Sequence, residues 1–267
     1  MPLTGVAGWP VAHSRSPALH EAAFASLGLA DWRSQLLPIP PDLFAETVAA
    51  LPGEGFVGIN VTIPHKLAAL RLADRSSPTA QACGAANTLS FHDGVVSAEN
   101  TDVPAIESAL EELAGDGGAP RVLVLGAGGS ARAALLAAAR IENAGVEIWN
   151  RTASRAEDLA AEFGVTATTD PQSFDLLVNT TSVGLDPSGA GLDDLPLEAA
   201  GLRGARGVVD LVYTDGGAPV ARAAIAAGVP VIDGLEVLVR QGALSVGSWT
   251  GRVPDLAVLR RAVAEAA

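Results

Sequence analysis

The chain has 267 residues, of which 49% are hydrophobic and 18% are charged. This length and apolar content allow two modest hydrophobic cores and exclude a disordered protein. The 17 Lys and Arg against 30 Asp and Glu give a net charge of -13, which would repel nucleic-acid phosphates and anionic membrane surfaces. We therefore expect no nucleic-acid partner and no membrane partner.

The single cysteine, Cys83, excludes an internal disulfide and a cysteine-rich zinc site. The first residues do not have the pattern of a secretory signal peptide. The longest apolar stretches, such as residues 133–139, are far shorter than the ~20 residues that a membrane-spanning helix needs. From these features we expect a cytoplasmic protein.

The first part of the chain has the rhythm of an open α/β sheet. Short apolar runs at residues 4–7 and 57–62 predict strands. They alternate with helix-like stretches at residues 17–27 and 41–51. We therefore expect a first α/β domain.

The end of this domain is predicted to be a hairpin, with strands at residues 88–92 and 95–99 around the turn signal Asp93-Gly94. A helix over about 103–114 follows and is broken by the Gly-rich stretch 115–120. A second series of strands and helices begins at Arg121. The sequence thus predicts two open α/β domains.

A glycine-rich turn opens this second domain. The strand-like run 121–125 leads into Gly126-Ala127-Gly128-Gly129-Ser130-Ala131 and an Ala-rich helix, which gives G-x-G-x-x-A in the context of a dinucleotide site. Gly126 permits the tight turn, Gly128 allows the backbone to approach a pyrophosphate, and Ala131 allows close helix packing. The alternative is an ordinary glycine-rich turn.

The end of the next strand, residues 146–149, indicates which dinucleotide is bound. It leads into Asn150-Arg151-Thr152, and Arg155 is one helical turn further on. An acidic residue here would bind the ribose 2'-hydroxyl of NAD, and none is present, whereas two guanidinium groups suit a 2'-phosphate. The sequence favours NADP, although two solvated surface arginines are the alternative.

Two routes of alcohol oxidation do not fit the sequence. Zinc catalysis needs several Cys, His or carboxylate ligands, and the four histidines have no ligand-like spacing, so we expect no metal. Short-chain dehydrogenases use Tyr and Lys four residues apart, but the single tyrosine, Tyr213, is followed at that distance by Gly217. Reduction of a ketone by hydride still needs a proton donor beside the forming alkoxide. The first domain must supply this donor.

Lys66 is the first candidate for the proton donor. It ends the segment 58–66, which runs from a strand into a helix that we expect to start at Pro64, at the carboxyl edge where such sheets bind ligands. The sequence has very few lysines, although an isolated lysine is usually a surface charge. The second candidate is Asp102, at the start of the next helix, where an N-cap role is equally open.

Several motifs in order along the chain resemble the signatures of the shikimate dehydrogenase family. Those similar to its substrate domain are His13-Ser14-Arg15-Ser16-Pro17, Asn60-Val61-Thr62-Ile63-Pro64-His65-Lys66, Gly84-Ala85-Ala86-Asn87-Thr88, Asn100-Thr101-Asp102 and Gly234 through Gln241-Gly242-Ala243. The glycine turn, the Asn150-Arg151-Thr152 segment and residues 175–182 resemble its NADP-binding part. The resemblance therefore covers nearly the whole chain.

This resemblance implies a discontinuous substrate domain, residues 1–102 and 236–267, and a Rossmann-like NADP domain, residues 103–235. The last helix, which begins near residue 235, would return to the first domain. The cleft between the domains would then close around the ligands.

The resemblance also implies a role for each matched residue. Lys66 and Asp102 would be the catalytic pair, with Lys66 as the acid and base at the carbon 3 oxygen. The substrate would be bound by Ser14, Ser16, Thr62, Lys66, Asn87, Asp102, Tyr213 and Gln241, the two serines holding its carboxylate. The cofactor would contact Gly126, Ala127, Gly128, Gly129, Ser130, Ala131, Asn150, Arg151, Thr152, Arg155, Thr181 and Gly234.

The implied reaction is the reversible, NADPH-dependent reduction of 3-dehydroshikimate to shikimate in chorismate and aromatic amino acid biosynthesis. Two alternatives stay open: a quinate/shikimate dehydrogenase that prefers NAD, and a non-catalytic NADP-binding regulator on the same scaffold. Leu185, where a methionine is common, and the segment 213–216, which lacks the proline often found after the tyrosine, depart from the family pattern. We expect a monomer or homodimer whose partner is a small-molecule substrate.

Overall fold

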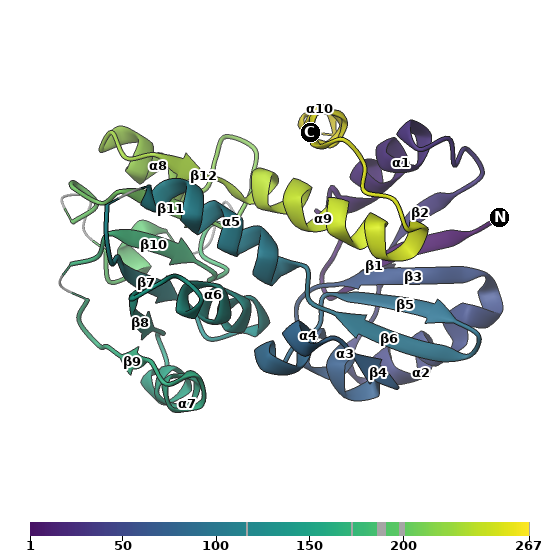
Figure 1. Ribbon diagram of the computed structural model, residues 1–267, viewed down its shortest axis with the longest axis horizontal. Coiled ribbons are helices and arrows are strands. Elements are labelled where there is room, and N and C mark those ends of the chain that lie inside the picture. Colours follow the sequence, from purple (N-terminus) through teal and green to yellow (C-terminus); the bar gives the residue numbers. More distant parts are fainter. Residues whose placement is uncertain (116, 172, 186–190, 198–200, 267) are drawn as a thin grey trace. The chain divides into compact units, whose positions relative to one another are not determined.

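A computed structural model describes residues 1–115, 117–171, 173–185, 191–197 and 201–266. Contacts divide the chain into two compact units: unit 1 is Met1–Thr101 with Leu238–Ala267, and unit 2 is Asp102–Val237. Each unit is built on a sheet that has six strands within the described residues (Figure 1), so the predicted α/β fold class is confirmed. In the part of the chain that the structure describes, no helix is long and apolar enough to cross a membrane.

The sheet of unit 1 is mixed and has the strand order β2-β1-β3-β5-β6-β4. The strand β1 pairs in parallel with β2 and β3, whereas β5 is antiparallel to both β3 and β6. The predicted hairpin is therefore present at the predicted residues. The strands are β1 (Leu3–Gly8), β2 (Arg33–Pro38), β3 (Phe56–Val61), β4 (Arg75–Ser76), β5 (Thr88–His92) and β6 (Val95–Glu99).

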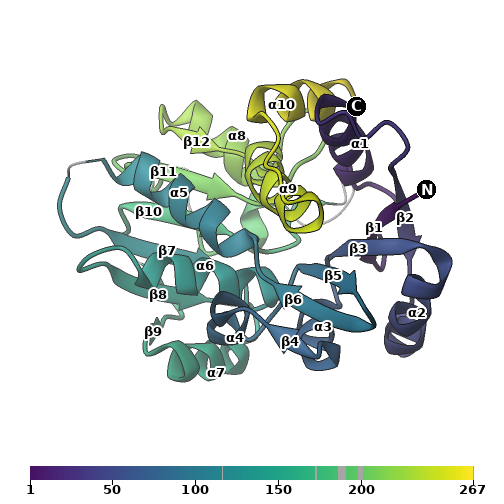
Figure 2. The ribbon, with the colours of Figure 1, turned by 45° about the vertical axis from the view of Figure 1, so that its right-hand side comes forward.

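The helices of unit 1 cover both faces of this sheet. Figures 1 and 2 show α1 and α10 on one face, with the part of α9 that belongs to unit 1, and α2 and α3 on the other. The helix α1 packs closely against α10 and β2. The helices are α1 (Ser16–Ser26), α2 (Phe44–Ala50), α3 (Lys66–Leu72), α4 (Pro78–Cys83), α9 (Gly234–Thr250) and α10 (Leu256–Glu265).

Two helix predictions need correction. The single helix expected over residues 41–51 is α2 flanked by 3-10 turns at Pro41–Leu43 and Leu51–Glu54, because prolines at both ends lack the N–H that a continuous α-helix uses. The helix that carries Gln241 is not the last one. Gly251, at a φ of 70°, ends α9 and separates it from α10.

The sheet of unit 2 is parallel throughout and has the order β12-β11-β10-β7-β8-β9. The connections through α6 and α7 run one way from β7, and the connection through α8 runs the other way. Because such crossovers are right-handed, these helices cover opposite faces. The elements are α5 (Asp102–Ala114), β7 (Arg121–Leu125), α6 (Gly129–Ala139), β8 (Gly145–Trp149), α7 (Ala153–Phe163), β9 (Thr166–Ala167), β10 (Leu176–Asn179), β11 (Gly207–Asp210), α8 (Pro219–Ala226) and β12 (Val231–Ile232).

The reversal of direction beside β7 creates the point where a doubly wound sheet binds ligands. The three strands β7, β10 and β11 carry almost uninterrupted apolar residues after Arg121, as expected for the part of a parallel sheet that is buried on both faces. Polar residues therefore first appear where these strands end. In unit 2 the candidate functional residues lie at those carboxyl ends.

Candidate active site

The loops that follow β1 and β3 lie side by side at one edge of the unit 1 sheet. The backbone N–H of Thr62 donates to Ala7 O at 2.8 Å, and that of Trp9 donates to Ile63 O at 2.9 Å. Because β1 and β3 are parallel neighbours, the residues after both strands emerge at the same edge. The predicted serines after β1 and the segment 62–66 after β3 therefore share this edge.

Ser14 and Ser16 lie at the start of α1, as expected. Ser14 Oγ donates to Ser16 Oγ at 3.1 Å and accepts from the backbone N–H of Ser16 at 3.3 Å. Arg15, between them, donates from its guanidinium to Val263 O of α10 at 3.0 Å. Two hydroxyl groups at the positive end of an 11-residue helix suit a carboxylate ligand.

Lys66 is the only lysine in the sequence and the first residue of α3. It is only 7% exposed. The backbone N–H of His65 donates to Thr62 O at 2.9 Å and closes a turn that contains Pro64, so the helix begins after this turn. The expectation of a proline-started helix is wrong in this respect. A nearly buried ammonium is costly to desolvate, and it lies at the edge where such sheets bind ligands, so Lys66 stays the candidate for the proton donor.

His65, the residue before Lys66, is itself held in place by two contacts. Its ring stacks on Phe44, with centroids 4.3 Å apart, and its Nε2 bonds to Ile39 O at 2.7 Å. Burial lowers the pKa of His65 below its ordinary value, and the bond to Ile39 opposes this shift. The ring stack on Phe44 and the hydrogen bond to Ile39 therefore fix the start of α3.

Asn87 is the centre of a buried polar network at the same edge. Its Nδ2 donates to Thr101 Oγ1 at 2.9 Å and to Gln241 Oε1 at 3.2 Å. Its Oδ1 accepts from the backbone N–H of Thr101 at 2.7 Å. The structure thus brings together Asn87 and Gln241, which are 154 residues apart in the sequence.

Asn60 and Ser245 extend this network, and the sequence reasoning did not single them out as site residues. Asn60 Nδ2 donates to Ser245 Oγ at 2.8 Å, to Thr88 Oγ1 at 3.0 Å and to Asn87 O at 3.0 Å. Ser245 is four residues after Gln241 and therefore on the same face of α9. Two features of the sequence point to these residues. Ser245 follows Gln241 by four residues, and Asn60 precedes Thr62 by two residues on the same strand and loop.

His20 lies behind this network and is fully buried. Its Nδ1 shares a 2.9 Å hydrogen bond with Ser34 Oγ, and its ring meets Trp249 edge-on with centroids 5.1 Å apart. Burial lowers the pKa of His20 to about 4, against an opposing interaction with Asn60. Among the described residues, His20 Nε2 and Asn60 Oδ1 are the buried side-chain atoms that have no hydrogen-bond partner.

Asp102 opens unit 2. It is the first residue of α5, directly after Thr101 in the chain, and it is buried. The preceding Asn100 is fixed in unit 1 by donating to Ala85 O at 2.9 Å. The carboxylate of Asp102 therefore follows a segment that hydrogen bonds hold in place.

The glycine turn of unit 2 has the geometry that the sequence predicted. Gly126 has a φ of 106°, and a side chain there would place its Cβ 2.7 Å from Thr180 Oγ1. Gly128 is different, because no atom lies within 4 Å of a Cβ built on it. Ala131, in the first turn of α6, is completely buried. The turn thus leaves open space beside the backbone of Gly128, at the start of α6. This space suits a pyrophosphate.

The end of β8 presents the two predicted arginines. Arg151 and Arg155 are exposed at the start of α7. Asn150 donates from Nδ2 to Thr152 O at 2.9 Å, and Arg155 donates from its backbone N–H to the same oxygen at 3.1 Å. This arrangement orders the segment from which two guanidinium groups reach solvent. It fits a phosphate ligand and carries no acidic side chain between residues 150 and 155.

Thr181 and Gly234 lie beyond the ends of β10 and β12. Thr181 donates from Oγ1 to Asn179 Oδ1 at 2.8 Å and from its backbone N–H at 3.1 Å. Gly234 is buried, and a side chain there would meet Leu211 O at 2.6 Å. Only a glycine allows this approach of the two backbones.

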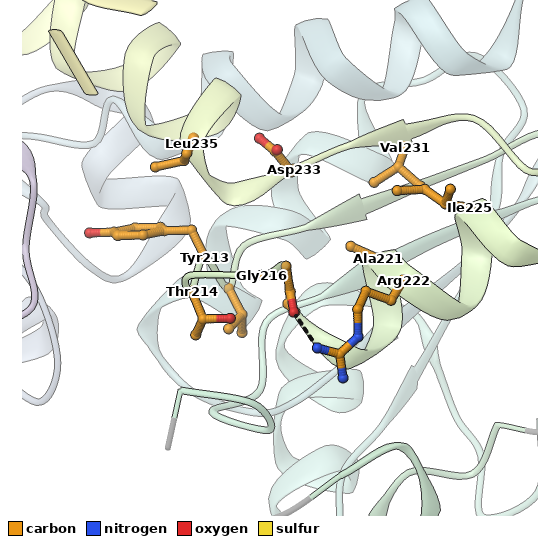
Figure 3. Close-up of a pocket in the computed structure, with 12 residues that line it drawn as sticks. Tyr213, Thr214, Gly216, Ala221, Arg222, Ile225, Val231, Asp233 and Leu235 are labelled. Carbon is orange, nitrogen blue, oxygen red and sulfur yellow. Dashed lines mark hydrogen bonds between the residues drawn. The ribbon is translucent and has the colours of Figure 1, made fainter. Parts of the chain in front are cut away.

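Tyr213 lines a pocket of about 220 Å³ within unit 2. Figure 3 shows its hydroxyl pointing away from the other labelled side chains, whereas Arg222 lies at the opposite end and donates to Gly217 O at 3.0 Å. Leu185, which departs from the family pattern, packs against the buried residues Val212, Ala218 and Ala221 beside this pocket. An apolar leucine therefore fills the position without disturbing its neighbours.

Comparisons with known proteins agree along the whole chain. A model of the shikimate dehydrogenase substrate binding domain matches residues 6–89, and a model of the shikimate 5'-dehydrogenase C-terminal domain matches residues 234–264. A shikimate dehydrogenase (NADP(+)) of Geobacter sp. strain M21 is 40% identical, over 98% of this chain and 94% of the relative.

Two solved structures extend the comparison to the fold. The shikimate 5-dehydrogenase of Thermus thermophilus, in complex with NADP(H) and shikimate, is 38% identical, with a TM-score of 0.85 and complete coverage of both chains. The ligand-free 5-ketofructose reductase of Gluconobacter sp. strain CHM43 is 31% identical, with a TM-score of 0.82 over 99% of this chain and 98% of that chain.

Proposed function

The chain belongs to the shikimate dehydrogenase family, and from this premise we propose that Lys66 and Asp102 catalyse the reversible, NADPH-dependent reduction of 3-dehydroshikimate to shikimate. The protein is an NADP-dependent oxidoreductase that acts on a CH-OH group, in the biosynthesis of chorismate and aromatic amino acids. The observation that carries the assignment of the residues is the burial of the only lysine at the ligand-binding edge of unit 1.

Lys66 donates the proton in the direction of reduction. The carbon 3 carbonyl of the substrate becomes an alcohol when hydride reaches the carbon and a proton reaches the oxygen, and NADPH supplies the hydride when bound. The ammonium of Lys66 gives its proton to this oxygen, and in the reverse direction the neutral amine removes it. A carboxylate can orient an ammonium, and this is the role that the proposal gives to Asp102.

Unit 1 recognises the substrate through polar groups that its sheet edge holds in place. Ser14 and Ser16 bind the substrate carboxylate at the start of α1, supported by their mutual hydrogen bond. Thr62, Asn87 and Gln241 bind the ring hydroxyls, with Tyr213 contributing from unit 2. A site built from buried amides rejects a ligand that lacks a matching hydroxyl, because the amides would be left without partners.

Unit 2 binds NADP through the glycine turn and the two arginines. Residues 126–131 hold the pyrophosphate with backbone N–H groups, while Asn150, Arg151, Thr152 and Arg155 bind the 2'-phosphate. Thr181 and Gly234 lie on the side of the nicotinamide. In this division, residues 1–102 and 236–267 form the substrate domain and residues 103–235 form the NADP domain.

The surroundings of the enzyme are proposed from its charge and composition. A net charge of -13 opposes binding to nucleic acid and to anionic membranes, so its partners are small molecules. A single cysteine suits the reducing cytoplasm, where we place the enzyme as a monomer or a homodimer.

One assay tests this function together with its substrate and cofactor preference. Purified protein is given 3-dehydroshikimate, 3-dehydroquinate or 5-ketofructose, each with NADPH and with NADH, and the loss of reduced cofactor is followed. We expect the largest kcat/KM for 3-dehydroshikimate with NADPH. A preference for NADH would refute the role of Arg151 and Arg155, and a larger kcat/KM for either of the other ketones would refute the substrate.

The single lysine allows a direct test of its place in the site. An amine-directed reagent can modify the side chain of Lys66 alone, apart from the chain's own terminus, and mass spectrometry reports the extent. Shikimate is expected to protect Lys66, and a buffer anion of equal charge such as acetate is expected not to. Equal labelling with and without saturating shikimate would remove Lys66 from the site.

A further inference from the structure

Asp210 is a buried carboxylate at the end of β11 that no step of the proposed reaction uses. It has no exposed surface. Its Oδ1 accepts from Asn179 Nδ2 at 2.9 Å and from the backbone N–H of Val212 at 3.1 Å. Its Oδ2 accepts from the backbone N–H of Ala221 at 3.1 Å. One side chain therefore joins the end of β10, the segment after β11 and the first turn of α8.

The first of these contacts leads to the proposed cofactor site. Asp210 accepts from Nδ2 of the Asn179 amide, and Oδ1 of the same amide accepts from the backbone N–H and from Oγ1 of Thr181. Thr180, between them, donates from Oγ1 to Leu125 O at 2.7 Å and lies against Gly126. The orientation of the Asn179 amide thus fixes the backbone of residues 180 and 181, which lies against the glycine turn.

The other two contacts lead to the pocket of Figure 3. Val212 and Ala221 both line this pocket, and Val212 immediately precedes Tyr213. The two N–H groups that donate to Asp210 come from different walls of the pocket. Asp210 thereby fixes the distance between the segment that carries Tyr213 and the start of α8.

Only a carboxylate satisfies this arrangement. Three N–H donors converge on two oxygen atoms, and an asparagine at residue 210 would turn its own NH₂ group toward at least one of them. The carboxylate is also costly to keep: burial raises the pKa of Asp210 to about 6, against the effect of its hydrogen bonds, and Asp233 contributes to the rise. A buried charge that is retained at such a cost at a ligand-binding edge indicates a specific task.

We infer that Asp210 is a positioning residue, which acts through Asn179 on Thr181 of the NADP site and through Val212 on Tyr213, a proposed substrate contact. It touches neither cofactor nor substrate and works by holding three chain segments in register. This inference rests on the proposed function, because Thr181 matters only if unit 2 binds the dinucleotide and Tyr213 only if it contacts the substrate.

The test compares Asp210→Asn with a control substitution at an ion pair of unit 2 that belongs to neither proposed site. Glu107, in α5, accepts from the guanidinium of Arg140 at 2.9 Å, so Glu107→Gln also removes a charge and a hydrogen bond from unit 2. The dissociation constant of NADPH is measured by fluorescence for the wild type and both variants, with circular dichroism as the check of folding.

We expect Asp210→Asn to raise the dissociation constant of NADPH at least about 10-fold, since a buried donor left without an acceptor is strongly unfavourable. Glu107→Gln is expected to stay within about 2-fold of the wild type. An effect of Asp210→Asn below about 2-fold, or equal effects of the two substitutions, would overturn the inference.

A second variant decides the matter if Asp210→Asn does not fold. Asn179→Ala removes the link to Thr181 and leaves the two backbone contacts of Asp210 in place, so weaker NADPH binding supports the inference and unchanged binding overturns it. Turnover of 3-dehydroshikimate by the wild type is recorded separately. If the wild type binds NADPH without turnover, the proposed function fails while the comparison at residue 210 can still be made.

Discussion

Acidification is expected to destabilise unit 1 through His20. The side chain is fully buried, and burial lowers its pKa from 6.5 to about 4. The folded state therefore holds this imidazole neutral at a pH where the unfolded chain is already protonated. Because the unfolded state binds more protons, the stability that His20 contributes is complete above about pH 6.5 and is lost as the pH falls toward 4.

The size of this effect follows from the difference between the two pKa values. A pKa that falls by roughly 2.5 corresponds to about 3 kcal/mol between fully neutral and fully protonated conditions. Between pH 7 and pH 5 most of the unfolded chain becomes protonated and little of the folded chain does, so about 2 kcal/mol of the free energy of unfolding is lost. This is a large fraction of the stability of a typical domain.

The assay is chemical denaturation at pH 7 and at pH 5, followed by tryptophan fluorescence in a Trp149→Phe background, which removes the single tryptophan of the unit 2 sequence. Trp249 reports on unit 1 because its indole meets the ring of His20 and donates to Leu89 O at 3.0 Å. His20→Gln removes the titrating group, and His92→Gln, at an exposed position of the hairpin, is the matched control. Asp210, whose pKa is raised, shifts unit 2 in the opposite direction, so each unit needs its own probe.

We expect His20→Gln to be less stable than the wild type at pH 7 and to lose about 2 kcal/mol less on going to pH 5. His92→Gln is expected to show the pH dependence of the wild type. An unchanged pH dependence in His20→Gln would show that the imidazole is not held neutral, and would contradict the burial of His20 behind the polar network of Asn87.

Three further variants test the proposed sites. Replacing both Arg151 and Arg155 by Ala should lower kcat/KM for NADPH by about 100- to 10,000-fold with little change for NADH, since two charge-assisted contacts of about 1.5–3 kcal/mol each are lost; equal losses with both cofactors would contradict this. Gly126→Ala should destabilise unit 2 by roughly 1–3 kcal/mol and weaken NADPH binding in a calorimetric titration, because of its positive φ and the contact with Thr180; unchanged binding would exclude it from the turn. Asn87→Ala should raise the KM for shikimate and reduce unfolding free energy by about 1–3 kcal/mol, and a normal KM would remove it from the substrate site.

Local patterns in the sequence predicted the parts of the fold that depend on neighbouring residues. The hairpin around Asp93-Gly94 and the glycine turn after β7 were found because each needs a special backbone conformation that few residues adopt. The strand β2 was not predicted, because residues 33–38 alternate weakly and carry an arginine and a proline at their ends. Its parallel pairing with β1 supplies the order that its own sequence lacks.

The polar network of unit 1 depends on contacts that no local pattern reveals. The bond from Asn60 to Ser245 spans 185 residues, and that from Asn87 to Gln241 spans 154. His20 was considered only as one of four histidines without metal spacing, and its burial results from the packing of α1 against α9 through Trp249. No local pattern points to Asp210, since its three donors converge only when β10, β11 and α8 are assembled.

In the proposed reaction the single lysine moves the proton at the carbon 3 oxygen, and the kcat of Lys66→Met with NADPH and 3-dehydroshikimate, compared with that of the wild type, measures this step most directly. Loss of a general acid is expected to lower kcat by about 100- to 10,000-fold, with the dissociation constant of NADPH unchanged because that site lies in unit 2. Turnover by Lys66→Met at the rate of the wild type would contradict this role of Lys66.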